Sequence, residues 1–307
     1  MPLSPRLVRT PTAEFPLTSE QIAVRDRLLR GLLDGSYPTV DVACFCGERE
    51  AITIAERDRY GLPVTTVLCP RCGLLRTSPR MDTETTRRFY ESDYRELYSG
   101  STDRGTMFQL QRIRGAKFLT ALQRAGLLDG VRTVFEVGCG AGGILLPFAR
   151  AGMNTAGCDL GADYLEVGRA HGLRLVHGDV SGLLAEVAHQ ADLVVLSHVA
   201  EHFTELTREL ADVMRAVRPG GYLLVEVPGV MTIPRDYQSN ILLYLQNAHN
   251  YHFTAATLGY VLRSMGLQLV SADEQIVAIA RRPVAWDQPE MHPTPPAGEA
   301  ARVLRFL

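Results

Sequence analysis

The chain has 307 residues, 46% of them hydrophobic and 21% charged, which is the balance of a soluble globular protein with one large domain plus a smaller one, or with two modest domains. The formal net charge of −2 gives no reason to expect nucleic acid or an anionic membrane as a partner. No apolar run approaches the roughly 18 residues of a membrane-spanning helix, and the first residues lack an apolar signal region, so we expect a cytosolic protein.

An N-terminal extension, residues 1–40, combines a proline-rich stretch with one predicted helix. Thr18 followed by Gln21 has the spacing of a capping box, in which each side chain bonds to the backbone N–H of the other residue. We expect the helix to run from there to residue 33 and to end at Gly35.

Four of the six cysteines lie in the next segment, residues 41–80, as two close pairs. Two short β-like runs, residues 51–54 and 64–68, separate the pairs. Pairs of this kind on tight turns can present four thiolates tetrahedrally to a structural zinc ion, and a reducing compartment disfavours disulfides. The predicted ligands are Cys44, Cys46, Cys69 and Cys72. A metal-free turn, or a redox pair formed by Cys69 and Cys72, is the alternative.

A helical connector, residues 81–130, follows the cysteine segment. Its two predicted helices cover residues 82–98 and 106–126. Aromatic side chains that include Tyr94 and Tyr98 fall on roughly one side of the first helix, which predicts that this side packs against another part of the protein.

From residue 131 short apolar runs alternate with helical stretches, the pattern of a parallel sheet covered by helices on both faces. The predicted strands are residues 133–137, 155–158, 173–177, 193–196, 222–227, 267–272 and 276–280. The predicted helices include residues 143–151, 164–171, 204–217 and 255–265. Only residues 273–275 separate the last two strands, too few for a crossover helix, so these two strands must be antiparallel. The fold class is therefore α/β.

A glycine-rich loop follows the first of these strands and leads directly into a helix. Gly138, Gly140 and Gly142 can adopt positive φ and let a ligand approach the backbone, and the helix start offers free N–H groups. With Gly143 the loop also satisfies the G-x-G-x-x-G spacing of dinucleotide-binding folds. The loop alone therefore leaves an NAD(P)-dependent oxidoreductase open.

Acidic residues end three of the predicted strands, at the edge where open α/β sheets bind their ligands. Glu136 precedes the glycine loop and can face the amino group of a ligand. Asp159 can accept the hydroxyl groups of a ribose, as it can in NAD enzymes, and Asp179 can meet the edge of an adenine. Alternatively, Asp159 caps the end of its strand and Asp179 is a solvated turn residue.

Together these stretches resemble a class I S-adenosylmethionine (SAM)-dependent methyltransferase over residues 131–281. The matching sequences are VFEVGCGAG at 134–142, GCD at 157–159, GD at 178–179, SHVAEH at 197–202 and RPGGYLLV at 218–225. The resemblance implies a Rossmann-like, seven-stranded and mostly parallel sheet with the last strand inserted antiparallel, SAM as the cofactor, and helices before residue 131 that fold over it. The residues implied in cofactor binding are Glu136, Gly138, Gly140, Gly142, Asp159, Leu160, Asp179, Val180, Ser197, His198 and Tyr98.

The cysteine segment is similar to the N-terminal zinc-binding module of methyltransferases that act on deoxysugars and surface polysaccharides. The similarity covers roughly residues 41–100 and is carried by DRYGL at 58–62, CPRCGL at 69–74, SPR at 78–80, Phe89-Tyr90 and Tyr94-Arg95. It implies a small, sugar-containing acceptor, methylated at oxygen or carbon, in surface-polysaccharide or natural-product biosynthesis. The single residue between Cys44 and Cys46 departs from the commoner two-residue gap.

The side chains expected to bind and deprotonate the methyl acceptor follow the fourth predicted strand or lie in a long insert, residues 230–253. Removing a proton from a hydroxyl or an amine requires a base, and histidine titrates near neutral pH. The candidate catalytic residues are Glu201, His202, His249 and His252. Alternatively, His202 orients a loop or caps a helix, and one of the two insert histidines is packed in the core.

Two other functions stay compatible with the sequence. The first is an NAD(P)-dependent oxidoreductase, which residues 218–221 and the terminal hairpin disfavour. The second is a zinc-ribbon interaction protein with a catalytically silent Rossmann domain. The sequence predicts a SAM-binding domain over residues 131–282 and a proline-rich tail, residues 283–307, with a helix at its end. It predicts no particular oligomeric state.

Overall fold

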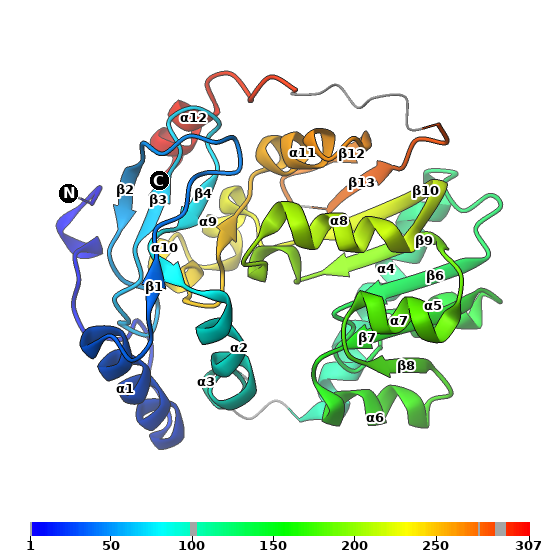
Figure 1. Ribbon diagram of the computed structural model, residues 1–307, viewed down its shortest axis with the longest axis horizontal. Coiled ribbons are helices and arrows are strands. Elements are labelled where there is room, and N and C mark those ends of the chain that lie inside the picture. The colour runs from blue at the N-terminus through cyan, green and yellow to red at the C-terminus, as the bar shows by residue number, and fades with distance from the viewer. Residues whose placement is uncertain (1, 99–102, 276, 286–292) are drawn as a thin grey trace.

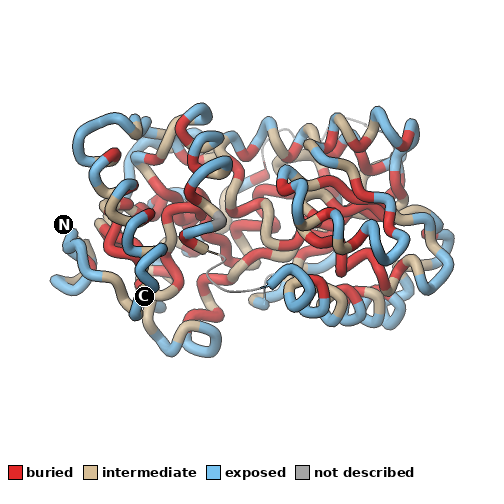
Figure 2. Tube along the Cα trace, turned by 90° about the horizontal axis from the view of Figure 1, so that it is seen from below, coloured by how far each residue is buried: buried red, intermediate tan, exposed pale blue. Residues whose placement is uncertain are grey.

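The computed structural model describes residues 2–98, 103–275, 277–285 and 293–307. A seven-stranded sheet with helices on both faces and a smaller N-terminal sheet lie side by side (Figure 1). Figure 2 shows that buried residues concentrate along the strands of the large sheet, while the outer surfaces of its helices are exposed. Within the described ranges, no helix is both long enough and apolar enough to span a membrane.

The large sheet has the strand order β12-β13-β10-β9-β6-β7-β8. Its strands are β6 (Thr133–Val137), β7 (Asn154–Asp159), β8 (Arg174–His177), β9 (Ala191–Ser197), β10 (Val217–Glu226), β12 (Gln268–Ala272) and β13 (Val277–Arg281). The first five run parallel, whereas β13 is antiparallel to both of its neighbours, β10 and β12. The predicted mostly parallel sheet with an antiparallel last strand is therefore confirmed. Residue 276, predicted to begin that strand, lies outside the described residues.

Helices cover both faces of the large sheet because successive strand residues point to opposite sides. One face packs against α4 (Arg104–Arg124), α5 (Leu145–Arg150) and α6 (Ala162–Ala170) through residues such as Val134. The other face packs against α7 (Val180–Val187), α8 (Leu206–Ala216) and α11 (Ala255–Ser264) through residues such as Phe135. The four helices predicted after residue 131 are present, with ends that differ by a few residues. The short helix α7, which starts soon after β8, was not predicted from the sequence.

The small sheet has the order β11-β4-β3-β2, and all its pairs are antiparallel. Its strands are β2 (Ile52–Ala55), β3 (Thr66–Leu68), β4 (Leu75–Thr77) and β11 (Tyr251–His252). A separate pair joins β1 (Thr39–Val40) to β5 (Arg80–Met81). Because β11 comes from the insert that follows β10, the insert is paired into the N-terminal sheet. The segment boundaries predicted from the sequence stay a prediction. Strand β11 belongs to the predicted SAM-binding domain but pairs with β4 of the predicted cysteine segment.

The chain ends beside the sheet near which it begins (Figure 1). The C-terminal helix α12 (Glu299–Phe306) buries Val303 in a cluster with Leu7, Ile54 and Leu68. The predicted terminal helix is therefore present, while residues 286–292 of the predicted tail lie outside the described residues.

The N-terminal helices include α1 (Ser19–Asp34), whose start is the predicted capping box of Thr18 and Gln21. The prediction of a single helix over residues 82–98 is wrong, because the structure has α2 (Thr83–Ser92) and α3 (Tyr94–Tyr98). Asp93 lies between them, fully buried, and its carboxylate accepts hydrogen bonds from Arg27 and Tyr37. The remaining short helices are η1 (Pro5–Leu7), η2 (Ala200–His202), η3 (Val230–Thr232), α9 (Ile233–Asp236) and α10 (Ile241–Tyr244).

Candidate active site

The glycine loop after β6 has the backbone conformation that its sequence predicts. Gly138, Gly140 and Gly142 have φ values of 71°, 53° and 79°, in the region that side chains disfavour. Gly143 has a different reason to be glycine, since a Cβ atom there would lie 2.2 Å from the carbonyl oxygen of Phe108 on α4. Helix α4 therefore lies directly against the loop.

Gln111 of α4 holds the glycine loop through both ends of its side-chain amide. Its Nε2 donates to the carbonyl oxygen of Cys139 at 3.0 Å, and its Oε1 accepts the N–H of Gly143 at 3.2 Å. This residue was not predicted from the sequence. Nothing local distinguishes Gln111 from the neighbouring Gln109, because only the packing of α4 on the loop gives it a partner.

Asp159 ends β7 and is tied to the same loop. Its Oδ2 accepts the N–H of Gly140 at 2.8 Å, and its Oδ1 accepts the N–H of Gly161 at 2.6 Å. Each carboxylate oxygen has a second lone pair, so both can also accept a hydroxyl group of a ligand. The predicted capping of the strand end and the predicted ribose contact are therefore compatible.

Glu136, on β6 just before the loop, is almost fully buried, and neither of its carboxylate oxygens has a hydrogen-bond partner among the described residues. Burial raises the pKa of Glu136 well above its usual value, and the nearby charge of Asp159 raises it further. Buried polar groups in proteins are normally paired. An unpaired carboxyl group at a strand end beside a glycine loop therefore fits a site for a ligand that donates hydrogen bonds.

The predicted residues Ser197 and His198, at the end of β9, belong to a polar network with two residues that the sequence analysis missed. The hydroxyl of Ser197 donates to Oε2 of Glu226 on β10 at 2.6 Å, and Nε of Arg114 on α4 lies 3.3 Å from the same oxygen. His198 has a φ of 57°, unusual for a residue with a side chain, and its Nε2 lies 3.6 Å from Glu226. Arg114 thus links α4 to the strand ends.

Three residues predicted to bind the cofactor follow the ends of β7 and β8. Leu160 is 72% exposed, an apolar side chain that nothing in the described structure covers. Asp179 caps the N-terminus of α7, and its Oδ1 accepts the N–H groups of Ser181 and Gly182 at 3.0 Å. Val180 follows as the first residue of α7 and is buried. Helix capping thus gives Asp179 a structural role. Both capping bonds use Oδ1, and Oδ2 takes part in neither of them.

In the part of the chain that the structure describes, Glu201 in η2 is another buried glutamate whose carboxylate has no hydrogen-bond partner. Histidines surround its Oε1, with Nδ1 of His198 at 3.4 Å, Nε2 of His202 at 3.8 Å and Nε2 of His249 at 4.0 Å. The predicted catalytic residues Glu201, His202 and His249 are thus brought together, although they come from different segments. Their ligand atoms lie close enough to hold a metal ion.

Burial favours the neutral form of three histidines here, His202, His249 and His252. It lowers the pKa of His202, lowers that of His249 well below its usual value, and lowers that of His252 to about 3. Nδ1 of His202 lies 3.0 Å from the carbonyl oxygen of Ala248, so the neutral ring carries its proton there and leaves Nε2 free to act as a base. His252 packs beside His249 with a centroid separation of 6.0 Å, and neither of its ring nitrogens has a hydrogen-bond partner within the described ranges.

Tyr98, predicted to contact the cofactor, reaches the insert. Its hydroxyl donates to Oδ1 of Asn247 and accepts the N–H of Ala248 at 3.2 Å. The neighbouring Tyr90 and Tyr94 lie against His202 instead, with Tyr90 Oη 3.0 Å from His202 Nδ1. Helices α2 and α3 therefore cover the histidine cluster, and their role toward the cofactor stays a prediction.

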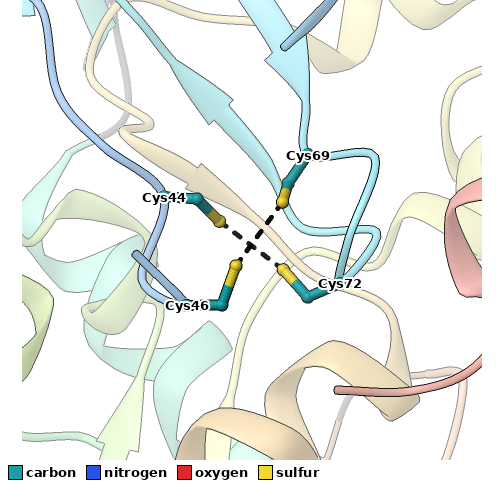
Figure 3. A group of neighbouring side chains, drawn as sticks. All are labelled: Cys44, Cys46, Cys69 and Cys72. Carbon is teal, nitrogen blue, oxygen red and sulfur yellow. Dashed lines mark hydrogen bonds between the residues drawn. The ribbon is translucent and has the colours of Figure 1, made fainter. Parts of the chain in front are cut away.

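The four predicted metal-binding cysteines converge on one point. Their sulfur atoms face a common centre (Figure 3), with Cys44 Sγ 3.5 Å from Cys72 Sγ and Cys46 Sγ 3.6 Å from Cys69 Sγ. Tetrahedral zinc with Zn–S bonds of about 2.3 Å separates its sulfur ligands by about 3.8 Å. The donor set and its spacing therefore fit zinc. The single residue between Cys44 and Cys46 does not prevent convergence.

Comparison with known proteins identifies a family. A family model described as "Methyltransferase domain" matches residues 110–272, more than half of the chain. The chain is 32% identical over 125 residues to a ubiquinone biosynthesis O-methyltransferase of Cronobacter sakazakii, which covers 39% of this chain and 51% of that protein. It is 28% identical over 163 residues to the protein of that name from Acinetobacter baumannii, covering 48% of this chain and 68% of that protein.

The chain spans about half the length of the first of these relatives. A solved structure with the same fold is that of the plantazolicin methyltransferase BpumL, in complex with a monoazolic desmethylPZN analogue and S-adenosylhomocysteine (SAH). The TM-score is 0.51 at 12% sequence identity, and the match covers 64% of this chain and 93% of that one. At this identity the match concerns the fold alone.

Proposed function

The chain belongs to the class I SAM-dependent methyltransferases, and from this we propose that it transfers a methyl group from SAM to an oxygen atom of a small molecule. One observation carries the proposal: Glu136 and Glu201 are buried carboxylates that both lack hydrogen-bond partners. Glu136 lies on β6 and Glu201 lies in η2, the short helix that follows β9. Because β6 and β9 are neighbouring parallel strands, both residues sit at the ligand-binding edge of the sheet. Two unpaired carboxylates there suit two ligands that donate hydrogen bonds.

The cofactor would occupy the side of Glu136. The carboxylate of Glu136 would accept from an amino or hydroxyl group, and Asp159 would accept the ribose hydroxyls with its free lone pairs. Leu160 and Val180 would pack against the adenine, while Asp179 would meet its edge. The exposure of Leu160 supports this placement, because an adenine ring would cover it. The predicted contacts of the glycine loop, Ser197, His198 and Tyr98 belong to the same proposal.

The acceptor would occupy the side of Glu201, and bound SAM would supply an electrophilic methyl group. Nε2 of His202 or His249 would take the proton of the acceptor hydroxyl as that oxygen attacked the methyl carbon. The carbon–sulfur bond of SAM would break, with its electron pair left on the sulfur. Glu201 stabilises the imidazolium that forms, and positioning of the two reactants supplies much of the rate enhancement.

We propose that the acceptor contains a sugar. The support is the likeness of residues 41–100 to the modules of sugar-modifying methyltransferases, together with the pairing of the insert strand β11 to that module. His252 would contribute to the acceptor side, because both of its buried ring nitrogens lack partners and a sugar offers many hydroxyl groups. The relatives named for ubiquinone biosynthesis suggest acceptors without a sugar as the competing class.

A mass-resolved methyl-transfer assay tests the function. The purified chain is incubated with SAM and either nucleotide sugars or hydroxyl-bearing compounds that lack a sugar. We expect methylation in the first panel, and its loss by at least about 100-fold in His249→Ala or His202→Ala. Methylation confined to the second panel would refute the sugar acceptor. Stabilisation of the chain by NAD, with none by SAM or SAH, would refute the methyltransferase activity itself.

We also propose that Cys44, Cys46, Cys69 and Cys72 hold one structural zinc ion. A site with four thiolates has no open position, so it stabilises the fold rather than taking part in the chemistry. Metal analysis should find one zinc per chain, and Cys69→Ser should lose both the zinc and the thermal stability. Cys158→Ala serves as the control, since Cys158 is buried in β7 outside the cluster. Full stability in chelator, with zinc absent, would contradict the proposal.

A further inference from the structure

Arg76 on β4 is a buried charge without a counter-ion. The residue is 1% exposed, its Nε donates to the carbonyl oxygen of Val42 at 3.2 Å, and its Nη1 has no hydrogen-bond partner. Among the residues that the structure describes, no carboxylate lies within ion-pair distance of it. A guanidinium is charged at every accessible pH and carries five N–H donors, so burying it with one carbonyl acceptor is costly.

Arg76 is one of the residues that line a cavity of about 240 Å³ on the N-terminal sheet. One wall is the segment 41–51, which carries Cys44 and Cys46, and the other is formed by β3, β4 and the residue after β4. The polar side chains that line the cavity are Asp41, Arg49, Arg76 and Ser78. Arg76 is opposite Val67 on β3 and Tyr251 on β11, so the cavity lies on the sheet and is no part of the glycine-loop site.

The lining favours an anion, since two of its polar residues are arginines and one is an acid. Arg76 is fixed by its strand, whereas Arg49 is exposed and free to turn toward a ligand. Ser78 accepts the N–H of Val42 at 3.2 Å and so holds the segment 41–51 against the strand. Asp41 is the competing partner, but its exposed carboxylate makes no ion pair with either arginine in the described structure.

We propose that this cavity binds a phosphate-type oxyanion, either free phosphate or the phosphate group of a larger metabolite. The planar fork of a guanidinium matches the geometry of phosphate oxygens, and a second arginine adds a charge-assisted hydrogen bond. The bound anion would neutralise Arg76 and join the cysteine-bearing segment to β4. The site therefore stabilises the N-terminal sheet and acts independently of methyl transfer.

Thermal unfolding of the full chain, at constant ionic strength with chloride as the balancing ion, tests the site. Inorganic phosphate should raise the Tm of the wild type with a saturable dependence, and calorimetric titration should give the matching Kd. Arg76→Met should abolish this effect and unfold no earlier than the wild type without phosphate, because it removes an unpaired buried charge. Arg49→Ala should weaken phosphate binding by about tenfold, and Arg30→Ala, on the exposed side of α1, should leave it unchanged.

Three results overturn the proposal, the third of which applies if Arg76→Met does not fold. The first is that phosphate raises the Tm of the wild type no more than chloride does, or raises the Tm of the wild type and of Arg76→Met equally. The second is that Asp41→Asn destabilises the phosphate-free protein, which would identify Asp41 as the partner of Arg76. If Arg76→Met does not fold, an equal phosphate Kd in the wild type and Arg49→Ala is the result that overturns it. A phosphomonoester of a sugar, compared with free phosphate, distinguishes the two sources of the anion. SAM binding is measured in parallel and should be unchanged.

Discussion

The carboxylate of Asp159 accepts the backbone N–H of Gly140 at 2.8 Å, and this bond joins the end of β7 to the glycine loop of β6. The loop is therefore held in shape by a residue 19 positions further along the chain. The same carboxylate also bonds to Gly161, so the positions of both strand ends depend on one side chain. A cofactor that uses Asp159 would meet a preformed acceptor.

Asp159→Asn should weaken SAM binding by about 10- to 100-fold. The amide lacks the charge that strengthens hydrogen bonds from the loop and from a ribose, each of which contributes about 1.5–3 kcal/mol when charge-assisted. Calorimetric titration with SAM and with SAH measures the change. Since Asp179 follows β8 and caps only its own helix, Asp179→Asn is the comparison and should have the smaller effect. Equal effects of the two substitutions would contradict the role given to the loop contact.

Gln111→Ala should raise the Kd for SAM by about tenfold, because two hydrogen bonds to the glycine loop are lost at about 0.5–1.5 kcal/mol each. The matched control is Gln109→Ala, two residues earlier on the same helix, where the side chain is exposed and bonds to Arg112. Titration of both variants with SAM separates loop positioning from a general effect on α4. A Gln109→Ala defect as large as that of Gln111→Ala would refute the positioning role.

Glu136→Gln should stabilise the protein and weaken its cofactor binding. Burial raises the pKa of Glu136 above its usual value, so its contribution to stability is present at acid pH and is lost as the pH rises through the folded-state pKa. Glutamine, an uncharged isostere, removes the cost of burying an unpaired carboxylate at neutral pH and should raise the free energy of unfolding by about 1–3 kcal/mol. Urea unfolding at pH 7.5 and pH 4 measures this free energy, and the difference between the variant and the wild type should shrink at pH 4. A variant that is less stable than the wild type at pH 7.5 would be inconsistent with an unpaired carboxylate.

The pH dependence of kcat/KM should follow the histidine cluster. Burial lowers the pKa of His202 and His249 from the usual value of 6.5, and a histidine base is active in its neutral form. Activity should therefore stay flat above pH 6.5 and fall only at lower pH, as the ring takes up a proton. Initial rates between pH 5 and pH 9 at saturating SAM measure the profile. A midpoint above pH 7 on the acid side would exclude either buried histidine as the base.

Local patterns were enough to predict most of the SAM-binding half. The apolar runs marked the seven strands, and the three residues before the last strand required the antiparallel hairpin, because so short a connection cannot cross a sheet. The glycine loop and the acidic residues at the strand ends could also be predicted, because their positions depend on residues nearby in the sequence. The break at Asp93 was not predictable, because it depends on Arg27 and Tyr37 from elsewhere in the chain.

The sequence by itself thus determined the fold class, the edge of the sheet that carries the site and the four cysteines that can form one cluster. Only the tertiary structure decided that Asp159 and Gln111 both bond to the glycine loop. It alone also decided which histidines lie beside Glu201. It also decided that β11 completes the N-terminal sheet and that Arg76 is buried without a counter-ion. The physical reason is that periodicity records which side of an element is buried, whereas pairing between distant elements depends on how their surfaces pack.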